Sequence, residues 1–266
     1  MADEEKKEVN DKFVLTNDKI RIGDTVLYRI KAIADFGDIK KGDIGGYVES
    51  EDNLSYAHEV IDEFGKFGDL KDYAWVYDNA MVYGGAIVSG NAIVKEFGSV
   101  YGNATVTDNA TVKGQSQIYG KATVSGKAKT YGNSKVYGNA IVSGDAELFG
   151  NARVYDNGKV FDDAKVFGNA WVFENGQVYG EASVSGNVQV FGNAWVYDKA
   201  RVFENVRLFG YISVLETAVV FGNGWFESEH RMNWDDRNYD TTQFVSIDRL
   251  NGLMLEYIDG RFNYNK

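Results

Sequence analysis

The 266-residue sequence has no cysteine, no proline and only two histidines. Without cysteine the chain cannot form a disulfide and has no thiol for catalysis or metal binding. The absence of proline suits a chain whose backbone amides are mostly paired in β structure. No apolar run approaches the about 18 residues of a membrane-spanning helix, so we expect no membrane partner.

The chain also lacks a positive balance, because its 39 acidic residues outnumber its 28 lysines and arginines and give a formal net charge of −11. The acidic excess lies toward the two ends of the sequence, whereas the middle is close to neutral. This balance argues against a nucleic-acid partner, which needs clustered lysine and arginine. The first residues, Met1 to Lys7, lack the apolar segment of a signal peptide, so we expect a cytoplasmic protein.

A six-residue repeat fills the middle of the sequence. A branched aliphatic residue, mostly valine, recurs at 25 positions six apart from Val76 to Val220, and only Thr130 departs from this pattern. Four residues after each comes a small residue, most often alanine, and a turn dipeptide such as Gly102-Asn103 lies between them. Spacing this regular predicts a repeat architecture.

Each repeat predicts a short strand followed by a corner. The small residue and the aliphatic residue are two apart, so they face the same side of a strand. Glycine and asparagine tolerate positive φ and therefore turn the chain without strain. Because strands this short cannot bury an apolar face alone, we expect them to stack in coils as an all-β parallel solenoid.

The hexad resembles that of the hexapeptide-repeat proteins, which fold as a left-handed parallel β-helix with three hexads in each triangular coil. By that resemblance the repeat implies about eight coils, stacked at roughly 4.8 Å per coil. Residues three hexads apart should then lie above one another. This expectation divides the outward residues into three columns, one on each face of the coil.

One outward column is aromatic throughout, and we call it and its flanking residues the aromatic face. Its members are Tyr83, Tyr101, Tyr119, Tyr137, Tyr155, Phe173, Phe191 and Phe209, flanked by Lys135, Arg153, Trp171 and Arg207. A continuous stripe of this size is typical of a binding surface, and we predict these residues as the binding site. Stacking of the rings on one another explains the column equally well.

The segments around the repeat predict a small β cap at each end. Gly23-Asp24 and Asn251-Gly252 each stand between strand-like runs and suit two-residue hairpin turns. An open solenoid end exposes unpaired backbone, which a cap would cover. We therefore divide the chain into a mobile charged tail (1–11), an N-terminal β cap (12–72), the left-handed β-helix (73–226) and a C-terminal cap with a β-hairpin (227–266).

The segment from Asp35 to Ser50, followed by Asn53-Leu54-Ser55, resembles the segment ahead of the β-helix in YdcK-like hexapeptide proteins. Those proteins are grouped with acyltransferases and occur in bacteria and prophages. The resemblance implies a homo-oligomer, with a trimer favoured, and an acyltransferase site between subunits. For a phage-encoded protein it also implies a location in the host cytoplasm.

Residues suited to catalysis are few. Hexapeptide acyltransferases usually rely on a histidine base, and His58 and His230 both lie outside the repeats. His230 is the weak candidate, because Glu229 beside it could raise its basicity. The pairs Asp162-Asp163 and Asp235-Asp236 could hold a hard cation, but adjacent carboxylates are usually solvated. We therefore expect no metal and no cofactor.

The sequence thus predicts a non-catalytic β-helix scaffold that acts through its aromatic face. It would assemble with itself or bind a protein partner, which for a phage protein includes the inhibition of host machinery. Two alternatives stay open: a hexapeptide-type acyltransferase with its site between subunits, and a protein that binds a nucleotide or a sugar.

Overall fold

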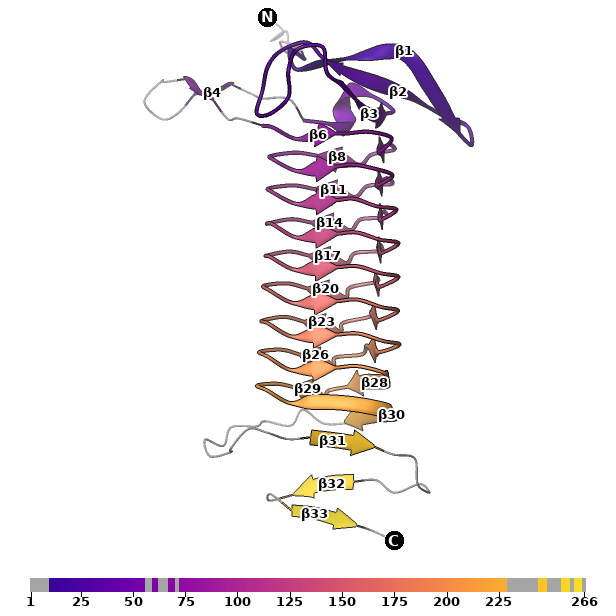
Figure 1. Cartoon of the computed structure of the whole chain (residues 1–266), viewed down its shortest axis with the longest axis vertical. Helices are drawn as coiled ribbons and strands as arrows, with labels where there is room; N and C mark the ends of the chain where they lie inside the picture. The colour runs from indigo at the N-terminus through magenta and orange to yellow at the C-terminus, as the bar shows by residue number, and fades with distance from the viewer. Residues whose placement is uncertain are drawn as a thin grey trace, which may run out of the picture.

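Figure 1 shows the computed structural model of the chain, a rod of stacked coils. The structure describes residues 10–55 and 72–228, and beyond these only the backbone of five short strands: β4 (Glu59–Ile61), β5 (Phe67–Asp69), β31 (Phe244–Ile247), β32 (Leu255–Ile258) and β33 (Arg261–Tyr264). The one helix among the described residues is the 3-10 turn η1 (Glu51–Asn53). No helix in this part of the chain is long and apolar enough to cross a membrane.

Each coil gives one strand to each of three faces. The first face holds β7 (Met81–Val82), β10 (Ser99–Val100), β13 (Gln117–Ile118), β16 (Lys135–Val136), β19 (Arg153–Val154), β22 (Trp171–Val172), β25 (Gln189–Val190) and β28 (Asn205–Gly210). The second holds β8 (Ile87–Val88), β11 (Thr105–Val106), β14 (Thr123–Val124), β17 (Ile141–Val142), β20 (Lys159–Val160), β23 (Gln177–Val178), β26 (Trp195–Val196) and β29 (Ser213–Val214). The third holds β6 (Trp75–Val76), β9 (Ile93–Val94), β12 (Thr111–Val112), β15 (Lys129–Thr130), β18 (Glu147–Leu148), β21 (Lys165–Val166), β24 (Ser183–Val184), β27 (Arg201–Val202) and the start of β30 (Val219–Ser228).

Strands on one face pair in parallel, each with the strand three hexads further along the chain. Val100 lies opposite Ile118, for example, and the amide of Tyr101 donates to the carbonyl of Ile118 at 2.9 Å. This register confirms that three hexads form one coil. The second face is a sheet of eight strands, so the solenoid has about eight turns. The left hand of the coil, which the resemblance implies, stays a prediction.

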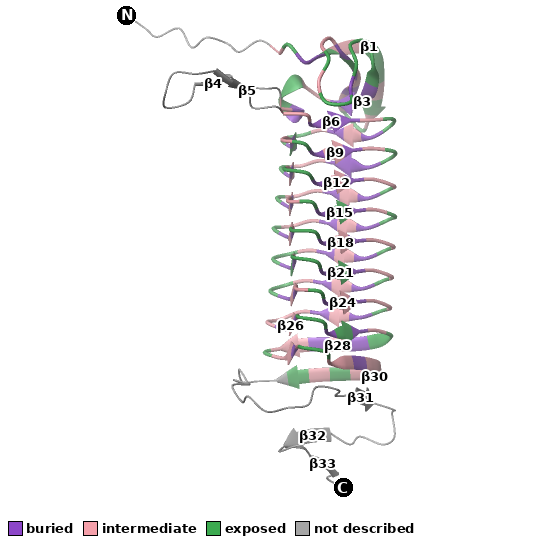
Figure 2. Ribbon diagram, turned by 60° about the vertical axis from the view of Figure 1, so that its left-hand side comes forward, coloured by how far each residue is buried: buried purple, intermediate pink, exposed green. Residues whose placement is uncertain are grey.

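The core is a narrow column of valine and alanine. The inward aliphatic residues from Val76 to Leu208 and the alanines beside them are almost all fully buried. Three polar residues share this interior: Ser116, Ser134 and Thr130. The two serine hydroxyls bond each other at 3.0 Å, whereas Thr130 Oγ1 finds no partner among the described residues. Figure 2 shows the exposed residues gathered at the corners between strands.

The corners use glycine or an acidic residue at positive φ. Within the described coils, the non-glycine residues with positive φ are all aspartate or glutamate, as at Asp108 (φ 60°). The Asp108 carboxylate accepts the backbone N–H of Gly126, one coil further on, at 2.9 Å. Glu96 accepts from Gly114 and Glu174 from Gly192 in the same way. The carboxylate therefore offsets the strain of a left-handed backbone by bonding an otherwise open amide.

At the upper end, β1 (Phe13–Ile22) and β2 (Thr25–Ala32) form an antiparallel pair in which Ile22 lies opposite Thr25. This pairing confirms the predicted hairpin at Gly23-Asp24. β3 (Ile44–Val48) pairs with β2 and also runs parallel to β7 of the first coil, so it adds a rung above the first face (Figure 1).

At the lower end, β30 pairs with both β27 and β28, and so continues the third and first faces by one rung. β31 pairs in parallel with β30, and the antiparallel pair beyond it is β32 with β33. The predicted hairpin turn at Asn251-Gly252 lies outside the described residues, so it stays a prediction. The division of the chain at residues 72 and 226 stays a prediction.

Candidate functional site: the aromatic face

The predicted aromatic column is a continuous ladder of stacked rings. From Tyr83 to Phe209, neighbouring ring centroids lie 4.8 to 5.2 Å apart and the ring planes are within 7° of parallel. The ladder follows directly from the three-hexad register, because each ring is carried by the same position of successive coils. The geometry of the column was therefore predictable from the sequence.

Stacking leaves only the ring edges free for contact. Every ring between Tyr83 and Phe209 is covered on both faces by its neighbours, and all eight aromatic residues are half-buried. A planar ligand therefore cannot lie on a ring face within this column. The same burial raises the pKa of the Tyr101 and Tyr155 hydroxyls to about 12.

The flanking residues form a second column beside the ladder. Strand pairing places Lys135 opposite Arg153, and Arg153 opposite Trp171. Arg207 lies lower on the same column, in register with Gln189. The four flanking residues predicted from the sequence thus share one face with the ring ladder.

Trp225 extends this column and was missed by the sequence reasoning. It lies opposite Arg207 on β30, it is 70% exposed, and it meets Phe209 edge-on at 6.5 Å. The predicted β-helix (73–226) contains residue 225, but the predicted aromatic face ends at Phe209. Its place three hexads after Arg207 was the signal that could have found it.

Two arginine–tryptophan pairs repeat along the flanking column. The Arg153 guanidinium lies 5.2 Å from the Trp171 ring centre, and that of Arg207 lies 5.0 Å from the Trp225 ring centre. Trp171 also meets Tyr155 edge-on at 6.4 Å. Tryptophan, tyrosine and arginine are the residues that dominate binding energy at protein interfaces. This arrangement makes the lower half of the aromatic face the best-formed contact surface among the described residues.

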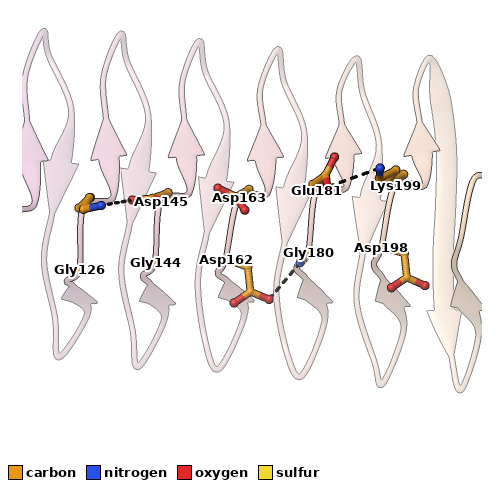
Figure 3. A pocket seen from close by; sticks show the side chains of 10 residues that line it. Gly126, Gly144, Asp145, Asp162, Asp163, Gly180, Glu181, Asp198 and Lys199 are labelled. Carbon is orange, nitrogen blue, oxygen red and sulfur yellow. Dashed lines mark hydrogen bonds and ion pairs between the residues drawn. The ribbon is translucent and has the colours of Figure 1, made fainter.

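The corner after the second face carries acidic side chains beside a groove. Figure 3 shows Asp162 beside Gly180, and the carboxylate accepts that glycine's N–H at 3.2 Å. Along the same corner Glu181 pairs with Lys199 at 3.7 Å. The described residues contain no group of three potential ligands that could hold a metal ion. The Asp162 carboxylate thus stabilises the corner by accepting the Gly180 N–H. The other acidic pair, Asp235-Asp236, lies outside the described residues.

A buried charge joins Ser55 and Asp72, the residues on either side of the segment that carries β4 and β5. Lys12 Nζ lies 3.3 Å from Asp72 and donates to the Ser55 carbonyl at 3.0 Å, and the Ser55 hydroxyl donates to Asp72. Burial lowers the pKa of Lys12, and the nearby Asp72 partly opposes that shift. This network holds Ser55 and Asp72 together at the top of the rod. Because its charges are satisfied within the network, we interpret it as a structural clasp.

His58 and His230, the two histidines of the chain, both lie outside the described residues. The assignment of His230 as a weak candidate base therefore stays a prediction. Among the described residues, stacked rings also occur on the second and third faces, but the unbroken ladder of eight rings runs along the first face.

The family model of the YdcK β-solenoid repeat matches residues 74–90 and 100–114. No curated protein gives a significant match to the chain. The matched residues belong to the first coils, whose hexads and three-hexad register continue unchanged down the rod. The chain is therefore a parallel β-solenoid repeat protein whose first coils match the YdcK β-solenoid repeat.

Proposed function

We propose that the protein is a non-catalytic rod that associates with further copies of itself through the lower half of its aromatic face. The observation that carries this proposal is the repeated arginine–tryptophan pair, above all Trp225, which is 70% exposed beside Arg207. A large apolar ring left in water at the side of a rigid surface favours burial against a partner.

The charges around the face support a second copy as the partner. In its described coils the face carries the cations Lys135, Arg153 and Arg207. The corner that follows this face carries Asp156 and Glu174, both exposed. In a cyclic assembly the face of one copy meets the edge of its neighbour, so these opposite charges would come together. A trimer remains the favoured form.

The rigidity of the surface also suits association. Backbone bonds between coils and the ring ladder hold the contact residues in place, so little conformational entropy is lost on binding. The ring edges between Tyr137 and Phe209 supply flat apolar area around the arginine–tryptophan pairs. The face therefore combines an apolar centre with a charged margin, as protein interfaces do.

The proposal is tested by measuring the mass of the protein in solution. Wild type should show a multiple of the 29.6 kDa chain mass by light scattering. Trp225→Ser combined with Arg207→Ser should lower that mass to the monomer. These two side chains are outward, so circular dichroism should show that the variant stays folded.

Ile87→Ser is the matched control, because Ile87 is an exposed apolar residue on the second face. It should leave the mass of the wild-type assembly unchanged. A monomeric wild type, or a double variant that keeps the full mass, would overturn the proposal.

The acyltransferase alternative stays a prediction that depends on His230. A thermal shift with acetyl-coenzyme A that His230→Ala weakens would support it. The phage or prophage origin, the inhibition of host machinery and the cytoplasmic location likewise stay predictions from the sequence.

A further inference from the structure

From Tyr131 to Phe221 the third face carries an aromatic column that is interrupted at a single rung. Tyr131, Phe149 and Phe167 stack at 4.9 and 4.8 Å, and Phe203 stacks on Phe221 at 5.3 Å. Ser185 occupies the rung between Phe167 and Phe203. The ladder of the first face has no such gap from Tyr83 to Phe209, so the interruption is a local feature of the third face.

The neighbouring outward column is interrupted at the same coil. Strand pairing places Ser183 between Lys165 and Arg201. The coil that contains β24 therefore presents two serines, whereas the coils above and below it each present a cation and a phenylalanine. The result is a notch one coil high. It opens into a surface groove of about 1000 Å³ whose lining includes Ser183, Ser185, Arg201 and Phe203.

The height of the notch fits one aromatic ring. Phe167 and Phe203 are two coils apart, which is roughly 9.6 Å at 4.8 Å per coil. A ring placed midway would lie about 4.8 Å from each phenylalanine, the spacing that offset-stacked rings prefer. The chain's own ladder shows the same spacing between Phe149 and Phe167. A planar ring would therefore complete the column as its missing rung.

The cations beside the notch are exposed and have no ion-pair partner among the described residues. Lys165 and Arg201 differ in this respect from Lys129, which pairs with Glu147 at 3.6 Å, and from Lys199, which pairs with Glu181. Four acids also line the groove: Asp145, Glu147, Asp163 and Glu181. Glu147 lies opposite Lys165 but pairs with Lys129, and Asp145 and Glu181 pair with Lys127 and Lys199. Two unpaired cations on either side of the Ser183 hydroxyl favour an anionic group at that point.

We propose that this notch binds a planar aromatic ring that bears an anionic group. The ring lies between Phe167 and Phe203 above the Ser185 side chain, and the anion lies between Lys165 and Arg201 beside the Ser183 hydroxyl. An aromatic carboxylate and a nucleoside phosphate share this chemistry. The site lies on the third face, so it is independent of the association proposed for the first face.

The test is isothermal titration of the full chain with three probes. 2-Naphthoate is planar and anionic, and it should bind saturably at one site per chain. Cyclohexanecarboxylate is anionic but not planar, and 2-naphthamide is planar but neutral; each should bind at least tenfold more weakly. Adenosine 5′-monophosphate is a fourth probe that distinguishes a nucleoside phosphate from an aromatic carboxylate. If it binds more tightly than 2-naphthoate, the natural ligand is a nucleotide.

Two substitutions separate the two halves of the site. Ser185→Phe fills the missing rung with the chain's own ring, so it should weaken 2-naphthoate binding at least tenfold while the melting temperature stays equal or rises. Arg201→Gln should weaken 2-naphthoate at least threefold and leave 2-naphthamide unchanged. Ser143→Phe, which adds a ring above Phe161 on the second face, is the matched control and should leave all affinities unchanged.

The proposal is overturned by any of three results. These are no saturable binding of 2-naphthoate by wild type, equal binding of cyclohexanecarboxylate, and full affinity in the Ser185→Phe variant. If Ser185→Phe fails to fold, Ser183→Leu closes the other half of the notch and replaces it, with the same tenfold loss expected.

Discussion

Thr130 is the one residue at an inward aliphatic position that carries a hydroxyl. It is fully buried, and its Oγ1 has no hydrogen-bond partner among the described residues. A buried polar group without a partner costs about 1–3 kcal/mol. Most other residues of the series, such as Val82, are valines, which carry a methyl group where Thr130 carries its hydroxyl. The interior of the coil therefore accommodates valine at this position.

We therefore predict that Thr130→Val raises the free energy of unfolding by about 1 kcal/mol. Urea titration followed by circular dichroism would measure the change. Thr107→Val is the control, because the Thr107 hydroxyl accepts a bond from Ser89 at 3.0 Å and its removal should bring no gain. A less stable Thr130→Val variant would show that the hydroxyl has a partner in solution.

The stacked tyrosines make stability depend on alkaline pH. Burial raises the pKa of Tyr101, Tyr155 and Tyr179 to about 12, from an ordinary value of 10.0. In the unfolded chain these groups lose their protons near pH 10, whereas in the rod they keep them to about pH 12. The unfolded state therefore binds fewer protons in this window, so stability is complete below pH 10 and falls as the pH rises toward 12.

We predict a steady loss of urea midpoint between pH 10 and pH 12. Replacement of Tyr101 and Tyr155 by phenylalanine keeps the ladder but removes two hydroxyls, so it should flatten this part of the profile. If the double variant loses stability with pH as wild type does, the loss of stability at alkaline pH comes from other groups, such as lysines at the corners.

At the scale of the element, the corner decides which residues the hexad tolerates. Gly102 has φ +74°, and a Cβ added to it would lie 3.0 Å from the Gly120 amide nitrogen. Alanine there must adopt a left-handed backbone, which costs roughly 1–2 kcal/mol. Aspartate bears the same cost, but its carboxylate can accept the N–H one coil further on, as Asp108 does.

We therefore predict that Gly102→Ala lowers the free energy of unfolding by about 1–2 kcal/mol. Gly102→Asp should recover about 1 kcal/mol of that loss through its hydrogen bond to Gly120. Urea titration of both variants beside wild type gives the two differences. An aspartate variant less stable than the alanine variant would contradict this account of the acidic corners.

The short strand of each repeat and the columns of stacked side chains were predictable from the sequence, because both follow from the six-residue period. One hexad fixes which residues point inward, and three hexads fix which rings meet. The role of corner carboxylates such as Asp162 was not predictable in this way, because it depends on a contact between side chain and backbone across coils. Trp225 fits the hexad count, because it follows Arg207 by three hexads. What the count does not express is that β30 runs past the corner and pairs with strands on two faces.

At the scale of the whole molecule, the rod is a one-dimensional stack in which each coil contacts only its two neighbours. Its stability has two sources, the inward aliphatic core and the outward ring ladders, and the two repeat along the sequence with different periods. The inward valines and alanines repeat with every hexad, so any coil can stack on any other. The outward ladders repeat only with every third hexad, so they form only when faces are aligned.

Deletions of different length separate these two sources. Removal of residues 117–134 joins Ser116 to Lys135 and takes out one full coil, so every column stays continuous. Removal of residues 117–122 joins Ser116 to Thr123 and keeps the inward hexad, but it places Tyr101 against Ser125 instead of Tyr119. The core is continuous in both variants, whereas the ring ladder of the first face is continuous only in the first variant.

We predict that the one-coil deletion melts within a few degrees of wild type, and that small-angle scattering shows a rod shorter by roughly 4.8 Å. The one-hexad deletion should also form a rod, but it should melt below the one-coil deletion because the ring ladder of the first face is broken at the junction, where Tyr101 and Tyr137 no longer share a column. Each aromatic pair contributes about 0.5–1.5 kcal/mol beyond its buried area. If the two deletions melt together, the outward columns add nothing to stability, and the coil alone then holds the aromatic face in its geometry.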